Sequence, residues 1–105
     1  MVKCLVNGAI DEATRQVVVD GLCRLDAEQF GGTGAVTVEF IEIPDGRWFT
    51  AGRPSKASMV LGTVPAGTPQ DVRIAYMDAV ARLFATATGT DYHDVMVSAP
   101  DRKGS

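Results

Sequence analysis

The chain has 105 residues, of which 46% are hydrophobic and 22% are charged, and its formal net charge is −3. This length suits a single domain, and an acidic balance without a cluster of lysine and arginine excludes a typical nucleic-acid binder. The sequence has no apolar run of the roughly 18 residues that a membrane helix needs, and two cysteines are too few for a disulfide framework. We therefore expect one cytoplasmic domain over residues 1–105, with a short polar tail over 99–105, that binds neither nucleic acid nor membrane.

The first part of the chain predicts a strand, a helix and a second strand. Residues 2–6 are mostly apolar and suit a short buried strand, which Gly8 helps to end. Asp11 is a good N-cap, and apolar residues recur at helical spacing over 12–29. The segment 35–43 is rich in β-branched residues and predicts the second strand.

The second part of the chain predicts the same order of elements after a loop. The loop carries a possible short strand at 48–50, and residues 58–64 suit a buried strand. Thr68 is expected to be the N-cap of a second helix, because a proline follows it at the first helical position. This helix is expected to run to about Thr88, and the last strand is expected over 93–98.

The expected fold class is α+β, with two β-α-β units that form a four-stranded sheet covered by two helices. Each connection is long enough to join parallel strands, and it should be right-handed. A chain this short buries only a modest core alone, so assembly with copies of itself is expected.

A sequence pattern in the second strand and its loop resembles a known family. Residues 38–52 follow V-x-F-x-E-x-P-x-G-x-x-F-x-x-G. This run resembles the tautomerase superfamily, nearest its cis-chloroacrylic acid dehalogenase and malonate semialdehyde decarboxylase branches, and residues 67–73 are similar to the family's turn into its second helix. The resemblance implies a homotrimer, catalysis by the amine of an N-terminal proline, arginines that hold the substrate carboxylate, and no cofactor.

The chain departs from the family at three central positions. The residue after Met1 is Val2, where the family has its catalytic proline. The family's arginine positions fall on Pro65 and Thr68, and its histidine late in the first helix falls near Cys23. The fold therefore transfers by resemblance, whereas the family's mechanism does not.

The N-terminal amine is the first candidate for catalysis. If Met1 is removed, the primary amine of Val2 could act as a base or attack a carbonyl. If Met1 stays, the nitrogen of Val2 is an amide, and Val2 is simply the first residue of a buried strand. Cys23 is a second candidate, as a thiol near the floor of the site; the alternative is a small apolar residue that packs against the sheet.

Cations and aromatic side chains could hold a small acid. Arg47, Trp48, Phe49 and Arg53 lie together in the loop after the second strand, so they could bind a carboxylate or an enolate. The alternative is a subunit contact with solvated cations. Arg73, in the first turns of the second helix, could replace a lost carboxylate clamp, or it could be solvated.

No metal site is expected, because a zinc site needs three or four converging ligands and the single histidine, His93, has no such partners nearby. Two classes of function stay open. The first is a tautomerase-type isomerase or lyase that acts on a small keto or unsaturated acid with an altered active site. The alternative is a non-catalytic trimeric binding or structural module, or a specialised biosynthetic enzyme.

Overall fold

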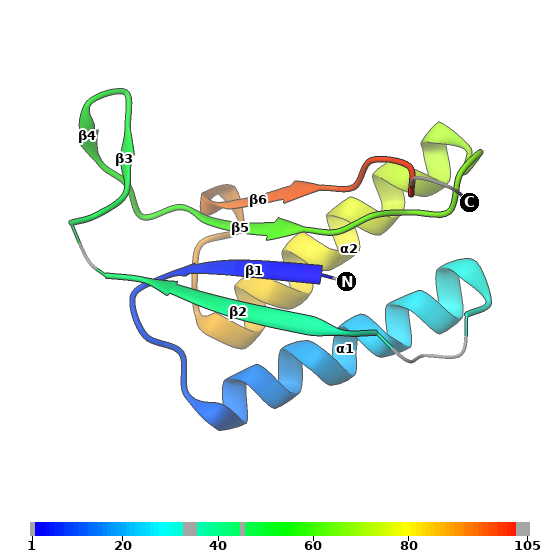
Figure 1. The fold of residues 1–105 in the computed structure, drawn as a ribbon, viewed down its shortest axis with the longest axis horizontal. Helices are drawn as coiled ribbons and strands as arrows, with labels where there is room; N and C mark the ends of the chain where they lie inside the picture. The colour runs from blue at the N-terminus through cyan, green and yellow to red at the C-terminus, as the bar shows by residue number, and fades with distance from the viewer. Residues whose placement is uncertain (1, 33–35, 45, 103–105) are drawn as a thin grey trace.

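The computed structural model describes residues 2–32, 36–44 and 46–102 (Figure 1). Its elements are β1 (Val2–Asn7), α1 (Glu12–Phe30), β2 (Val38–Ile43), β3 (Phe49–Thr50), β4 (Arg53–Pro54), β5 (Ser58–Leu61), α2 (Gln70–Thr88), the 3-10 helix η1 (Tyr92–Asp94) and β6 (Val95–Ser98). This order confirms the two predicted β-α-β units. Strands β3 and β4, which form a separate hairpin, lie between the units.

The described residues form a four-stranded mixed sheet with the order β2-β1-β5-β6. Strand β1 runs parallel to β2, and β5 runs parallel to β6, so each β-α-β unit supplies one parallel pair. Strands β1 and β5 are antiparallel and join the two units in the middle of the sheet, where Cys4 lies opposite Val60.

Local capping signals explain where α1 begins and where both helices end. The Asp11 carboxylate accepts a hydrogen bond from the backbone nitrogen of Thr14 at 2.7 Å, as expected of an N-cap. Gly31 and Gly89 end the helices with φ values of 63° and 73°, a left-handed conformation that glycine adopts without steric cost.

The core lies between the sheet and the two helices, which pack on the same face of it (Figure 1). Alternate residues of β1 point toward the helices, and Cys4 at the centre of this row is fully buried. The helices contribute Val18 and Leu22 from α1 and Phe84 from α2, each no more than 1% exposed. Because burial disfavours the thiolate, it raises the pKa of Cys4 to about 12, and this thiol is a packing group.

Two predicted boundaries in the middle of the chain are wrong. The strand expected over 35–43 begins at Val38 instead; residues 36 and 37 are outside it, and residue 35 lies outside the described residues. Thr68 is not the N-cap of α2, because its hydroxyl donates to the carbonyl oxygen of Pro65 at 2.6 Å. The N-cap is Pro69, which makes no side-chain capping bond.

The last two predicted strands are shorter than expected. Strand β5 ends at Leu61, and Val64 instead forms an isolated bridge with Asp101. The strand expected over 93–98 begins only at Val95. Its first residues form η1, because the Asp91 carboxylate accepts a hydrogen bond from the backbone nitrogen of His93 at 2.9 Å.

The sheet face away from the helices carries a row of apolar side chains. Leu5 lies opposite both Ile41 and Met59, and Met59 lies opposite Met96, so the four residues cross all four strands. Ile41 is 40% exposed and Met96 is 44% exposed. Neither described helix covers this face. We call these four residues the open-face row.

Candidate functional site

A cavity of about 410 Å³ opens where β1 begins, between the end of α1 and the C-terminal segment. We call it the strand-end pocket. It is lined by Val2, Asp26, Phe30, Gly32, Val36, Thr37, Thr63, Pro65, Tyr76 and Arg102. Its volume falls within the range of about 300–1,000 Å³ that is usual for small-molecule sites.

Val2 brings a backbone nitrogen to this pocket. The parallel pairing of β1 and β2 places Val2 opposite Val38, and the Val2 nitrogen donates to the carbonyl oxygen of Thr37 at 2.8 Å. Val2 is only 6% exposed, because its side chain belongs to the core. Removal of Met1 would convert this nitrogen into a primary amine at the edge of an apolar core.

Tyr76 is the phenol of the pocket. It comes from α2, is 6% exposed, and packs edge-on against Phe30 with ring centroids 4.9 Å apart. Burial is the main reason why the pKa of Tyr76 is raised; the Asp26 carboxylate raises it further, and Arg102 opposes the rise. The phenol therefore stays protonated at neutral pH, and it can donate a hydrogen bond to an oxyanion.

Asp26 and Arg102 bring opposite charges to the same cavity. The Asp26 carboxylate lies against the backbone of Gly32, so closely that a side chain at position 32 would clash with it. Arg102 is held by its backbone nitrogen, which donates to the carbonyl oxygen of Val64 at 2.7 Å. Its Nε atom donates to Oγ1 of Thr63 at 3.4 Å. The pocket thus combines a carboxylate, a guanidinium and a neutral phenol.

Comparisons with solved structures identify the fold. Native Ps01740 superposes with a TM-score of 0.89 at 28% identity, over 98% of this chain and 94% of that chain. A member of the cis-3-chloroacrylic acid dehalogenase family superposes with a TM-score of 0.88 at 19% identity, over 98% of this chain and 75% of that chain. Native fused 4-OT superposes with a TM-score of 0.82 at 17% identity, over 96% of this chain and 85% of that chain. No protein-family model matches the sequence, and no curated protein does.

The chain has the tautomerase-superfamily fold. The expectation drawn from residues 38–52 is thus confirmed at the level of the fold. Fused 4-OT structures among these neighbours are described as symmetric and asymmetric trimers.

Of the site residues proposed from the sequence, only Val2 lines the strand-end pocket. Cys23 is half-buried on α1 and does not line it. Arg73 lies at the start of α2, where it donates to the carbonyl oxygen of Ala99 at 2.7 Å and pairs with Asp101. The guanidinium of Arg73 is therefore engaged with the C-terminal segment.

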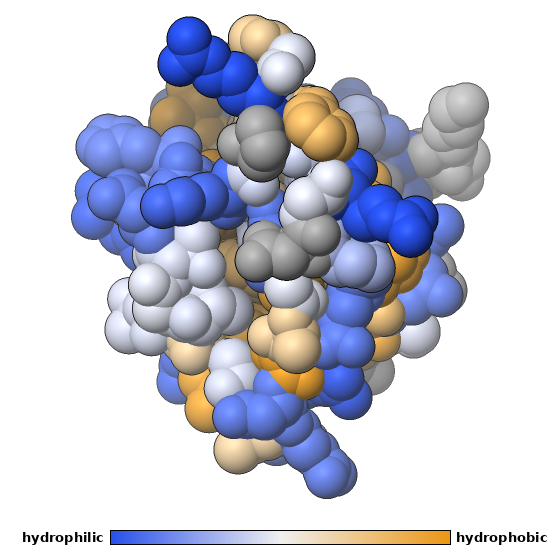
Figure 2. Space-filling model, turned by 90° about the vertical axis from the view of Figure 1, so that its left-hand side faces the viewer, coloured by the Kyte–Doolittle hydropathy of each residue, from blue (hydrophilic) through white to orange (hydrophobic). Residues whose placement is uncertain are grey.

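The other proposed residues belong to the β3–β4 hairpin or to the turn before it. These are Arg47, Trp48, Phe49 and Arg53. The hairpin lies on the side of the molecule toward which β1 runs, away from the start of β1, so a single chain of the tautomerase-superfamily fold does not bring these residues to Val2 (Figure 1). Phe49 is 56% exposed. Figure 2 shows the hairpin end of the molecule as mostly hydrophilic, with apolar side chains in small separate groups.

Three functional groups of the pocket were not predicted as site residues. Tyr76 and Asp26 were not singled out from the sequence, and Arg102 was assigned to the polar tail over 99–105. The residues near Arg102 in the sequence do not indicate that it lies at the pocket. Arg102 is positioned by the bridge between Val64 and Asp101, which are far apart in the sequence. Asp26 follows Cys23 by three residues on α1 and lines the pocket, whereas Cys23 does not.

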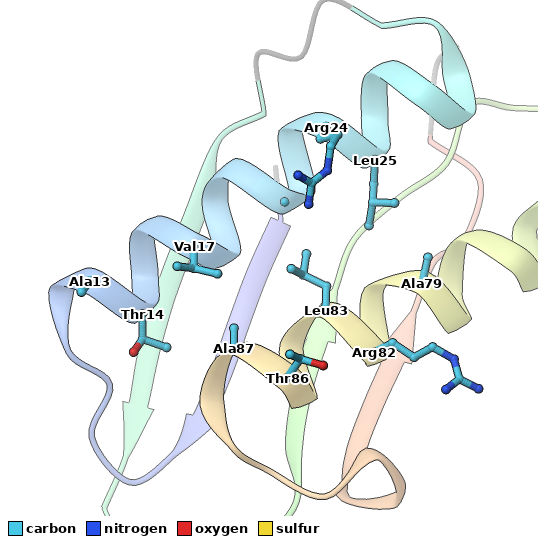
Figure 3. A pocket seen from close by; sticks show the side chains of 11 residues that line it. Ala13, Thr14, Val17, Arg24, Leu25, Ala79, Arg82, Leu83, Thr86 and Ala87 are labelled. Atoms are coloured by element: carbon cyan, nitrogen blue, oxygen red, sulfur yellow. The ribbon is translucent and has the colours of Figure 1, made fainter.

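A second cavity, the helix groove, has a volume of about 580 Å³ and lies between α1 and α2 (Figure 3). Leu83 points from α2 toward α1, while the Arg82 guanidinium points away from α1. The residues that line the groove are Ala13, Thr14, Val17, Gly21, Arg24, Leu25, Ala79, Arg82, Leu83, Thr86 and Ala87. The described residues of the groove include no carboxylate, thiol or imidazole, so the strand-end pocket is the better candidate for acid–base chemistry.

Within residues 2–32, 36–44 and 46–102, no three side chains of His, Cys, Asp or Glu converge as a metal would require. Neither described helix is long and apolar enough to cross a membrane.

Proposed function

We propose that this protein is a tautomerase-type isomerase or lyase that acts on a small keto or unsaturated acid in the strand-end pocket. The catalytic base is the α-amine of Val2, freed by removal of Met1. The observation that carries this proposal is the position of the Val2 nitrogen, 2.8 Å from the carbonyl oxygen of Thr37, in a residue that lines a cavity with Tyr76 and Arg102.

The chemistry requires a neutral amine. An α-amine has an ordinary pKa of about 7.7–8.0, and burial lowers it because the charged form loses solvation. The neutral amine takes a proton from the carbon beside the substrate carbonyl, and the carbonyl oxygen becomes an enolate oxygen. The protonated Tyr76 hydroxyl can donate a hydrogen bond to that oxygen. The ammonium then gives its proton to the enolate oxygen, so that the keto form becomes the enol and the amine is neutral again.

We also propose that the protein is a homotrimer. The open-face row supports self-association, because a contiguous apolar row is more stable when a second copy covers it. In the trimer, the hairpin of one subunit contributes Trp48 and Phe49 to the strand-end pocket of a neighbour, with Arg47 and Arg53 beside them. The exposure of Phe49 in a single chain supports this arrangement.

A non-catalytic binding module is the second candidate. It is favoured by Val2 itself, because a valine amine stands where the tautomerase superfamily has a proline. This function requires the cavity and its charges but no free amine. A specialised biosynthetic enzyme with a larger apolar substrate is a variant of the first proposal, with Met59, Trp48 and Phe49 as the apolar contacts.

A covalent probe separates the two candidates. Pt0534, which shares this fold, is inactivated by 2-oxo-3-pentynoate. We expect a free Val2 amine to add to the alkyne of this probe: a nitrogen–carbon bond forms, one π bond breaks, and a proton moves from nitrogen to carbon. The intact mass should rise by one whole probe molecule, and peptide mapping should place the adduct on Val2.

Thiol modification is the main alternative outcome of that experiment. Cys4 is fully buried and its pKa is raised to about 12, so it should not react. The Cys23→Ser variant removes the other thiol and should still form the adduct. If the chain lacks Met1 and still forms no adduct at Val2, the catalytic proposal is wrong and the binding module takes its place.

A further inference from the structure

The C-terminal segment 99–102 runs beside the strand-end pocket, and we call it the C-terminal strap. Ala99 anchors it in the core, with 5% exposure. Backbone hydrogen bonds then fix it to Val64: the Val64 nitrogen donates to the carbonyl oxygen of Pro100 at 3.0 Å, and the Arg102 nitrogen donates to that of Val64 at 2.7 Å. These bonds bring Arg102 to the rim of the cavity.

Arg73 holds the strap from the side of α2. Its Nη1 atom donates to the carbonyl oxygen of Ala99 at 2.7 Å, and its Nη2 atom pairs with the Asp101 carboxylate. The Arg73 side chain is only 18% exposed. The hydrogen bond from Arg73 is the main reason why the pKa of Asp101 is lowered. Because these contacts occupy both terminal nitrogens of the guanidinium, Arg73 acts on the pocket through the strap.

Arg102 is the cation that the C-terminal strap positions at the pocket. Among the described residues that line the pocket it is the single arginine or lysine, and its Nε atom reaches Oγ1 of Thr63 at 3.4 Å. The ion pairs of the described residues do not include Arg102. A guanidinium without a carboxylate partner, in a cavity large enough for a small molecule, can bind a carboxylate with its planar fork of donors.

Pro65 and Arg102 line the same pocket. Pro65 is one of the two residues that occupy the expected arginine positions between the third strand and the second helix, and it lines the same pocket. Pro65 supplies no positive charge to the cavity, and the C-terminal strap supplies one through Arg102 instead.

The charge of Asp26 limits which anion fits. Asp26 and Arg102 both affect the pKa of Tyr76, so both charges lie near the phenol. One guanidinium balances one incoming carboxylate, whereas a second carboxylate would meet the negative charge of Asp26. The pocket is thus suited to a small monocarboxylate rather than a dicarboxylate.

We infer that Arg102 is the anion-binding residue of the strand-end pocket, that its ligand is a small monocarboxylate, and that Arg73 is a positioning residue that acts on Arg102 through the C-terminal strap. The inference rests on the proposed function for the choice of an organic acid as ligand. Its test measures binding of an unreactive acid, so that a failure of catalysis and a failure of anion binding give different results.

The experiment is a titration with phenylacetate, which carries one carboxylate and no keto group, followed by calorimetry or amide shifts. We expect Arg102→Gln to weaken binding about 10–100-fold, as loss of a charge-assisted hydrogen bond does, and Arg102→Lys to keep part of the affinity. The matched control is Arg82→Gln, which removes the same charge from a residue paired with Asp78 outside the pocket. The control should bind phenylacetate as the wild type does.

Arg73→Gln distinguishes positioning from direct binding. It should weaken phenylacetate binding less than Arg102→Gln does, and it should speed hydrogen exchange at the Arg102 amide that bonds to Val64. The double variant should bind no more weakly than Arg102→Gln alone, because Arg73 acts through Arg102. Additive losses would overturn the positioning role of Arg73.

The preference for a monocarboxylate over a dicarboxylate is tested separately. Asp26→Asn should improve binding of phenylsuccinate, a dicarboxylate, more than binding of phenylacetate. Equal improvement of both would overturn the preference for a monocarboxylate. The anion site itself is wrong if the wild type does not bind phenylacetate, or if Arg102→Gln and Arg82→Gln weaken binding equally.

Discussion

The nitrogen of Val2 donates to the carbonyl oxygen of Thr37 at 2.8 Å, beside the cavity where β1 begins. This hydrogen bond fixes the place of the nitrogen whether it is an amide or an amine, since a neutral amine can donate in the same way. The reactive atom of the proposed enzyme is thus positioned by sheet pairing rather than by its own side chain.

The Val2 amine predicts a particular pH dependence of kcat/KM. We expect the rate to rise with pH as the amine loses its proton, with a midpoint below about 7.7–8.0 because burial disfavours the charged form. The measurement is a pH profile of phenylpyruvate conversion on protein shown by mass to lack Met1. The Val2→Pro variant should keep the rising limb, because its secondary amine occupies the same position. A rate that does not change between pH 5 and 9 would argue against an amine base.

We expect the Tyr76 phenol to lose its proton at a higher pH than a free tyrosine does. Its pKa is raised above the ordinary value of about 10, first by burial and then by Asp26. The raised pKa gives stability that is fully present below the unfolded-state value and is lost as the pH rises through the folded-state value. The only other tyrosine, Tyr92, also has a raised pKa, chiefly because it donates to Asp78, so the ultraviolet titration is made in the Tyr92→Phe variant. A midpoint near that of a free tyrosine would contradict the burial of Tyr76.

The contact between Gly21 and Leu83 predicts a sensitive point in helix packing. A Cβ atom added at Gly21 would lie 2.5 Å from Cδ1 of Leu83, so a larger residue forces Leu83 to move. We expect Gly21→Val to lower the free energy of unfolding by about 1–3 kcal/mol, the usual range for overpacking. Urea denaturation measures this change.

Leu83→Ala is the companion variant for that measurement. It removes the side chain that Gly21→Val displaces, so the double variant should lose less stability than the two single losses combined. Additive losses would show that the two residues do not share a contact.

The open-face row predicts how self-association can be disrupted. Ile41→Lys places a charge in the row, and we expect the mass measured by light scattering to fall to that of one chain. Val17→Lys is the matched control, because Val17 is 53% exposed on α1, on the opposite face of the sheet. The interface proposed for this face is wrong if the two variants show the same oligomeric state.

Local signals allowed the helices to be predicted, because their caps depend on nearby residues. Asp11 begins α1 through a bond to Thr14, three residues away, and Gly31 and Gly89 end the two helices. Thr68 carried the same kind of signal but was misassigned, since its hydroxyl donates to Pro65 rather than capping the helix.

The pocket was harder to predict because its parts meet only in the folded chain. Val2 was a candidate because it follows Met1, at the position where the resembled family has its proline. Arg102 depends on backbone bonds to Val64, and Tyr76 has the periodicity of an ordinary core residue. Arg73 looked like a cation available for a ligand, yet the strap occupies it.

The most direct test of the proposed function is the rate of enol–keto conversion of phenylpyruvate, followed by ultraviolet absorbance on two preparations of the same chain. In one preparation the intact mass shows that Met1 is absent; in the other an N-terminal extension keeps the nitrogen of Val2 as an amide. We expect conversion faster than buffer in the first preparation and the buffer rate in the second. Equal rates in the two preparations would contradict catalysis by the Val2 amine.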